Sequence, residues 1–97
     1  MLQLIMIKSW KHKGLKLFYA TGSVAKIQAA HAERIHDILQ TLDAATTPEQ
    51  MNLPGLAFHK LSGNLKEFHS VKVNGNWRII FGFEGHDAIL VDYKDYH

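Results

Sequence analysis

Residues 68–81 decide the fold of this chain, and they read FHSVKVNGNWRIIF. Two runs rich in β-branched and aromatic residues flank Asn74-Gly75, a pair that favours a two-residue hairpin turn. The register that follows is Val73 opposite Asn76, Val71 opposite Arg78 and His69 opposite Ile80. The stretch therefore predicts two antiparallel strands, with residues 76–81 in the middle of a small sheet.

A third strand is expected at residues 88–93, after a turn that contains Gly85. If Phe81 lies opposite Val91, one face of the sheet is apolar and must be covered, because a slip by one residue would expose the whole apolar set. That face carries Trp77, Ile79, Phe81, Phe83, Ile89, Val91 and Tyr93. Arg78 then points to the other face, together with His69 and Tyr96. Strand parity sends Asp95 and His97 away from Arg78, unless the last residues leave the strand.

The preceding half of the chain predicts helices. Residues 4–10 suggest a short first strand, and residues 13–19 a helix that ends at Gly22. Ser23 is suited to cap a second helix. Its apolar stripe is Ile27, Ala30, Ile35, Ile38, Leu39 and Leu42. Thr47-Pro48 starts a further short helix. Two antiparallel helices packed on one face of a mainly antiparallel sheet make this an α+β fold.

Composition limits the possible classes of protein. Ninety-seven residues predict a single domain over 1–97, with residues 1–5 an extension if translation starts at Met6 and not Met1. The chain has no Cys, which excludes disulfides, thiolate metal sites and a Cys nucleophile. The apolar start is too short to span a membrane and lacks the features of a signal peptide. We therefore expect a cytoplasmic protein that needs no metal and no other cofactor.

Positive charge is concentrated at the start of the chain. No Asp or Glu precedes Glu33, although the net charge of the whole chain is only +2. The unopposed lysines in that part are Lys8, Lys11, Lys13, Lys16 and Lys26. Such an asymmetry favours an anionic partner, with nucleic acid the first candidate. The alternative is a solvated lysine face whose counter-charges are supplied by the fold.

An ordered set of short motifs resembles the HigB-type toxins of bacterial toxin–antitoxin modules, which belong to the RelE superfamily. The set covers nearly the whole chain from Met6 onwards. It consists of Lys11 to Leu15, Arg34-Ile35 with Asp37, His59 to Gly63, Asn76 to Ile79, and Asp95-Tyr96-His97.

The resemblance implies a RelE-like fold and an endoribonuclease that cuts mRNA in the ribosomal A site. It also implies a HigA-like helix-turn-helix antitoxin as inhibitor, with operator DNA bound only through the antitoxin complex. The active-site positions carried over are His59, Arg78, Asp95, Tyr96 and His97. Lys8, Lys11, Lys13, Lys16 and Lys60 are the expected contacts to RNA and the ribosome. Some relatives have a lysine where this chain has Ser62, so the cation that assists Arg78 is not identified by the resemblance.

These residue types also suit RNA cleavage on chemical grounds. RNA carries its own nucleophile, the 2′-hydroxyl, so the enzyme needs only a base, an acid and a cation for the phosphorane. His59, His97 and Asp95 can exchange protons, Tyr96 can donate a proton or stack on a base, and Arg78 matches phosphate oxygens. Four of them have a structural alternative: Arg78 pairs with Glu67 or Asp92, His59 is a half-buried loop histidine, Tyr96 closes the core, and His97 is a frayed end residue.

Two other functions remain open at this point. A toxin of the same superfamily can act on another target, such as DNA gyrase, without nuclease chemistry. A basic RNA-binding module can bind without catalysis. A gyrase inhibitor has no need of the five active-site positions, which favours the nuclease. His31 and His36 lie five residues apart, whereas zinc ligands on one helix face are three or four apart, so no metal site is expected.

Overall fold

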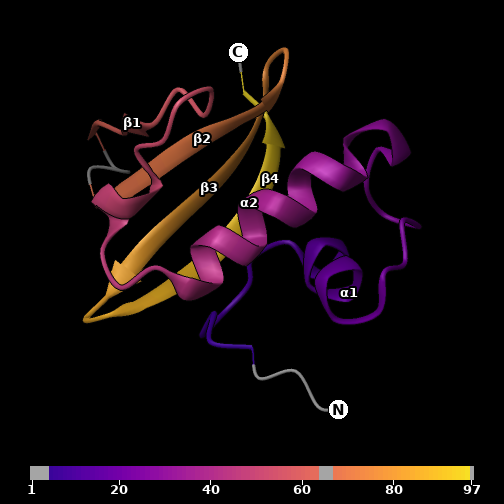
Figure 1. Ribbon diagram of the computed structural model, residues 1–97, viewed down its shortest axis with the longest axis horizontal. Coiled ribbons are helices and arrows are strands. Elements are labelled where there is room, and N and C mark those ends of the chain that lie inside the picture. The colour runs from indigo at the N-terminus through magenta and orange to yellow at the C-terminus, as the bar shows by residue number, and fades with distance from the viewer. Residues whose placement is uncertain (1–4, 64–66, 97) are drawn as a thin grey trace.

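The computed structural model describes residues 5–63 and 67–96, and it has helices on one side of an antiparallel sheet (Figure 1). The helices are α1 (Lys13–Thr21), η1 (Ala29–His31), α2 (Ala32–Ala44) and η2 (Pro48–Met51). The strands are β1 (His59–Lys60), β2 (Phe68–Asn74), β3 (Trp77–Glu84) and β4 (Asp87–Asp95). Their order in the sheet is β1-β2-β3-β4. The expected α+β architecture is therefore confirmed.

The core lies between the helices and one face of the sheet. In Figure 1, α2 lies across β3 and β4, and α1 is seen nearly end-on beside it, so the two helices cross and are not antiparallel. The fully buried side chains at their contact include Leu15, Ile35, Leu39, Val71, Ile79, Phe81 and Val91. Trp77 and Phe83 pack at the edge of this core. The predicted assignment of Ile79, Phe81, Val91 and Tyr93 to the covered face is correct.

The turn between β2 and β3 differs by one position from the expected turn. Asn74 pairs with Trp77, so the two turn residues are Gly75 and Asn76, and Gly75 has a φ of +56°. A bulge between Lys72 and Asn74 then places Val71 opposite Ile79 and Lys72 opposite Arg78. The predicted register was wrong because it set Val71 opposite Arg78, which would remove a fully buried valine from the core.

A second bulge changes the course of β4. The pairing shifts between Ile80 and Gly82, and Leu90 has a φ of +52°, which is uncommon for a residue other than glycine. Beyond the bulge, Ala88 is buried in the core and Ile89 pairs with Gly82 on the other face. The expectation that Ile89 faces the core was therefore wrong.

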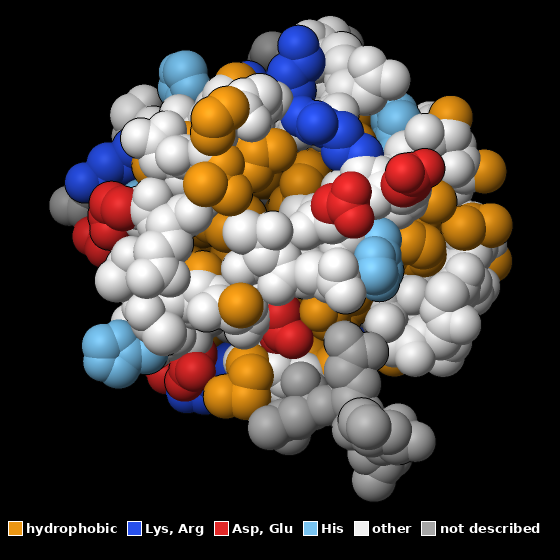
Figure 2. All heavy atoms as spheres, viewed as in Figure 1, with side chains coloured by type: hydrophobic (Ala, Val, Ile, Leu, Met, Phe, Trp, Pro, Cys, Tyr) orange, Lys and Arg blue, Asp and Glu red, His pale blue; other side chains and the backbone are white. Residues whose placement is uncertain are grey.

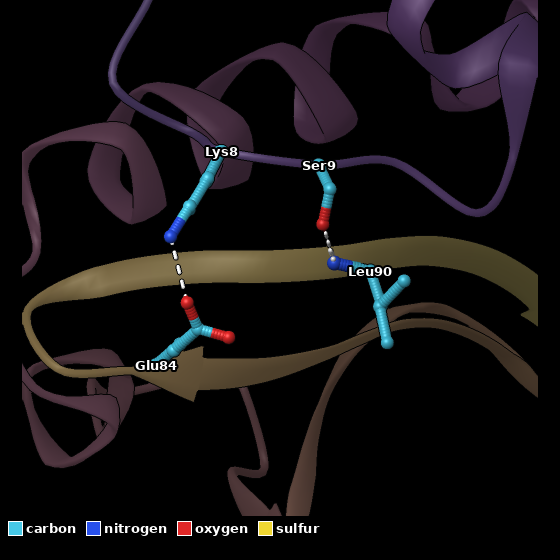
Figure 3. A network of polar contacts seen from close by, with 4 residues as sticks. All are labelled: Lys8, Ser9, Glu84 and Leu90. Carbon is cyan, nitrogen blue, oxygen red and sulfur yellow. Dashed lines mark hydrogen bonds and ion pairs between the residues drawn. The ribbon is translucent and has the colours of Figure 1, made fainter.

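The N-terminal segment follows β4 without forming a regular strand. Trp10 makes a single parallel bridge to Val91, and the Lys8 N–H donates to the Ala88 carbonyl at 2.9 Å. The Ser9 hydroxyl accepts the Leu90 N–H at 2.9 Å, and Lys8 forms an ion pair with Glu84 at 2.7 Å (Figure 3). The expected strand over residues 4–10 is thus an extended segment, and its first residue lies outside the described part.

The first helix was predicted correctly and the second starts later than expected. The His12 Nδ1 accepts the Leu15 N–H at 2.9 Å at the start of α1, and Gly22 ends it with a φ of +83°. Ser23 does not cap α2, because residues 23–28 form a loop with a turn at 25–26 and α2 begins only at Ala32. The short helix expected after Thr47 is present as η2. None of the helices in residues 5–63 and 67–96 has the length and apolarity to cross a membrane.

Candidate active site

Three cations form a row across the face of the sheet that the helices leave open. Lys72 pairs with Arg78, and Arg78 pairs with Lys94, so the three residues lie on neighbouring strands and share one face. Like charges directly opposite one another destabilise a sheet. None of the three forms an ion pair with an acidic side chain of the described residues. This cation row is therefore a candidate anion site.

Two hydrogen bonds within the protein hold the guanidinium of Arg78 in place. Its Nη1 donates to the Ser70 hydroxyl at 3.1 Å and to the Ala57 carbonyl at 3.3 Å. Ser70 is fully buried, and Ala57 has a φ of +46°, an uncommon conformation of the kind found where backbone strain supports a site. Both bonds use one nitrogen, whereas a guanidinium has five N–H donors, so the fork retains donors for phosphate oxygens. The structural alternative for Arg78, an ion pair with Glu67 or Asp92, is not what the structure shows.

His59 lies on the same open face. It pairs with Ser70 across β1 and β2, and Ser70 pairs with Ile80 of β3. The side chain of His59 is exposed. Ser70 thus lies beside His59 and also binds Arg78, so a histidine and a guanidinium lie on one face of the sheet.

The structure does not bring Asp95 onto the face of Arg78. Asp95 pairs with Trp77, so the ladder continues to the end of β4 and strand parity holds. Asp95 therefore belongs to the helix-covered side, at its rim. Tyr96 is exposed, and its N–H donates to the Asn76 carbonyl at 2.7 Å. His97 lies outside the described residues.

His69 is part of the core side and not of the open face. It pairs with Phe81, and its ring stacks between Phe58 and Phe81 with centroid distances of 5.4 and 5.8 Å. Its Nδ1 is buried without a hydrogen-bond partner among the described residues. The prediction that His69 accompanies Arg78 was wrong, because it depended on the shifted register.

Burial of His69 makes the stability of the fold sensitive to acid. Burial lowers the pKa of His69 from its usual 6.5, and the charges of Glu49, Lys60 and Glu67 act more weakly. Below pH 6.5 the unfolded chain binds a proton that the folded chain does not, so the free energy of unfolding falls by at most about 1.4 kcal/mol per pH unit. This loss is absent above the unfolded pKa and develops as the pH falls towards the lowered one.

We expect His69→Phe to reduce this acid sensitivity, because phenylalanine keeps the stack and cannot bind a proton. The measurement is thermal melting of both proteins at pH 5 and pH 7.5. His86→Ala is the matched control, since His86 is exposed in the turn between β3 and β4 and should leave the sensitivity unchanged. Equal acid sensitivity in wild type and His69→Phe would contradict the assignment.

Only some of the lysines near the N-terminus lie close together. Lys8, Lys13 and Lys16 line a hollow of about 600 Å³ together with Trp10. Lys8 is paired with Glu84, which raises the pKa of Lys8, so the fold supplies one of the missing counter-charges. Lys11 is exposed, and Lys60 lies apart on β1, opposite His69.

The outer surface of the molecule beside α2 carries side chains of both charges. Figure 2 shows acidic and basic side chains side by side around an apolar hollow on this face. The hollow lies between α2 and residues 53–56 and is lined in part by Glu33, Arg34 and Asp37. Arg34 donates to the Gly55 carbonyl at 2.7 Å and to that of Lys72 at 3.3 Å. Arg34 therefore anchors a loop and does not belong to the cation row.

Lys72 and Lys94, which the pairing places beside Arg78, are the candidate residues that the sequence analysis missed. The alternation of side chains along each strand was a usable signal, since both lysines follow a core residue and therefore point to the opposite face. The predicted hairpin register was wrong by one position. It set Arg78 opposite Val71 and so hid the row.

Comparisons with known proteins identify the family of this chain. The model of a family described as the RelE-like toxin of type II toxin–antitoxin system HigB matches residues 8–97. A curated relative, Endoribonuclease HigB of Proteus vulgaris, is 42% identical over 92 residues, which is 95% of this chain and 100% of the relative. Toxin HigB-1 of Vibrio cholerae serotype O1 is 33% identical over 78 residues, 78% of this chain and 82% of the relative. The chain therefore belongs to the HigB-like family of RelE-like type II toxins.

Proposed function

We propose that the protein is an endoribonuclease that cleaves mRNA in the ribosomal A site and so inhibits translation. The observation that carries the proposal is the cation row Lys72, Arg78 and Lys94, which has no acidic partner among the described residues. The Proteus vulgaris relative, named Endoribonuclease HigB, supports the same activity.

The chemistry needs no metal ion. The 2′-hydroxyl of the RNA gives up its proton to a base and attacks the adjacent phosphorus. The bond to the 5′-oxygen breaks, an acid protonates that oxygen, and the products are a 2′,3′-cyclic phosphate and a 5′-hydroxyl. We assign the negative charge of the phosphorane to Arg78 and the neighbouring lysines. His59, Asp95 and His97 are the candidates for the base and the acid, and Tyr96 for a donor or a stacking partner.

The placement of these residues suggests the path of the RNA. Arg78 and His59 lie on the open face, and Asp95 lies at the rim of the covered face. The Tyr96 N–H binds the Asn76 carbonyl, so the end of β4 and the β2–β3 turn lie together. Figure 1 shows the end of β4 near this turn. We infer that the RNA crosses this end of the sheet and meets both faces there.

The test in cells is primer extension on mRNA after expression of this chain is induced. Cuts confined to translated, in-frame codons are expected. Arrest of growth without mRNA cuts would contradict the nuclease and point to another toxin target.

The free protein is expected to cut purified mRNA poorly in the absence of ribosomes. The reason is that His59 and Asp95 lie on different sides of the sheet and the cation row is open to solvent, so the enzyme alone positions a flexible message weakly. Cleavage of one message with and without purified ribosomes measures this. Equal rates at equal enzyme concentration would contradict the requirement for ribosomes.

Lys13 and Lys16 are expected to contact ribosomal RNA. The double variant Lys13→Ala/Lys16→Ala should bind ribosomes more weakly. The slope of log K against log salt should be shallower by about 0.7–0.9 for each lost phosphate contact. Lys8→Ala is a matched control, because Lys8 is already paired with Glu84 and should change the slope less. Unchanged ribosome binding in the double variant would show that these lysines serve another purpose.

The family also implies an antitoxin partner. We propose a HigA-like helix-turn-helix antitoxin, with operator DNA bound only through the complex, and we place the protein in the cytoplasm with its ribosomes. An adjacent reading frame that encodes a helix-turn-helix protein would support this, and co-purification of its product with the toxin tests it.

A further inference from the structure

A cavity of about 640 Å³ lies on the helix-covered side, at the end of β4. One wall is the end of the sheet, with Trp77, Tyr93 and Asp95. The other wall is the segment between the helices, which contributes Lys26 and Gln28. Its volume is within the range typical of small-molecule sites. The cavity is separate from the open face that carries Arg78, because Trp77 and Asp95 have the opposite strand parity.

The walls of this cavity are fixed by contacts within the protein. Trp77 stacks on Tyr93 with ring centroids 4.6 Å apart. The Tyr93 hydroxyl lies 2.7 Å from the His31 Nδ1 and accepts the Gln28 N–H at 3.4 Å. On the outer side, a Cβ added at Gly14 would overlap the side chain of Lys26, so the segment is closely packed on the start of α1. The aromatic wall and the backbone of the facing segment are therefore fixed in place.

Its lining combines aromatic, amide and cationic groups with one carboxylate, that of Asp95. Trp77 is partly exposed and offers an aromatic surface, Gln28 offers an amide, and Lys26 and Lys94 are cations. Unpaired bases are bound in this way, by stacking on aromatic rings beside hydrogen-bonding and cationic groups. Lys94 has a special position, because it ends the cation row and also lines the cavity.

We propose that the cavity binds the base of one unpaired nucleotide of the RNA substrate, next to the phosphate on the cation row. Lys94 connects the two, so that a nucleotide spans the edge strand with its phosphate on the open face and its base against Trp77. This inference rests on the proposed nuclease function and adds a base-binding site to it. Loss of the stacking contact is expected to weaken binding about 5- to 150-fold.

The chain offers a direct reporter, because it has two tryptophans. In a Trp10→Phe protein, Trp77 is the single tryptophan, and its fluorescence reports on the cavity. The probes are short 2′-O-methyl RNA oligonucleotides, which bind but cannot be cleaved because the nucleophile is blocked. A second series carries an abasic sugar at one position at a time. We expect the complete oligonucleotide to quench Trp77, and one abasic position to abolish the quenching.

Gln28→Ala provides a second measurement that does not disturb the core, since Gln28 is exposed. It should weaken binding of the complete oligonucleotide about 3- to 10-fold. The melting temperature of the protein and its affinity for the abasic oligonucleotide should stay unchanged. Quenching that no abasic position changes, or no quenching up to millimolar oligonucleotide, would overturn the proposal. If quenching depends on the base but the protein cuts no mRNA in cells, the nuclease function is rejected and the base-binding site is retained.

Discussion

Arg78→Ala is expected to lower the rate of mRNA cleavage about 10²–10³-fold, the usual effect of removing one fixed donor to a developing negative charge. Arg78 is the central cation of the row and is fixed by Ser70 and the Ala57 carbonyl. Its contribution should appear mainly in the catalytic rate, because the phosphorane carries more charge than the bound phosphate. The measurement is single-turnover cleavage of a defined message on programmed ribosomes.

The other arginine of the chain is a matched control. Arg34→Ala removes the same charge and also two hydrogen bonds to backbone carbonyls, at Gly55 and Lys72. It should cost about 1–2 kcal/mol of stability but change the cleavage rate of the folded protein far less. Arg78→Lys should fall between wild type and Arg78→Ala, since it keeps the charge and loses the fork. A folded Arg78→Ala protein with the wild-type rate would contradict the role of the cation row.

Local sequence signals predicted most of the fold. The alternation of apolar residues in β3 gave the correct covered face, and Gly22 gave the correct end of α1. Both errors in register come from irregular backbone. The turn uses Gly75 and Asn76 after a bulge, and Leu90 takes a left-handed conformation in β4. Bulges depend on pairing across strands, which short sequence patterns do not contain.

The site was predicted only in part, because it depends on those pairings. Arg78 and His59 were identified by residue type and family pattern, and the structure places both on the open face. The cation row needs the register of all three strands at once, which the shifted turn concealed. The position of Asp95 depends on how far β4 stays paired, and it pairs to its last residue.

The family pattern itself contains two kinds of residue. Several of its positions are structural: His12 caps α1, Gly14 allows the approach of Lys26, and Leu15 and Ile35 are fully buried. His59 and Arg78 are exposed or partly exposed on the open face. A motif shared across relatives therefore has to be separated by burial and contacts before its residues are assigned to chemistry.

Deletion of His97 is expected to remove toxicity while the fold remains nearly intact. The described residues before it are anchored without it, since Asp95 pairs with Trp77 and the Tyr96 N–H binds the Asn76 carbonyl. The change in the free energy of unfolding should be well below about 1 kcal/mol, as for surface substitutions. Loss of a positioned acid or base typically lowers the rate about 10²–10⁴-fold.

The two effects are separated by pairing thermal melting of the shortened protein with its growth inhibition and its cleavage of mRNA. His97→Ala is the companion variant, because it keeps the chain length while removing the imidazole. If His97 serves as acid or base, both variants should melt like wild type and cleave at the same low rate. If the deletion alone loses activity, the backbone at position 97 and not the imidazole is required. If both fold and remain fully toxic, His97 has no part in the mechanism, and the proton transfers must be assigned to His59 and Asp95.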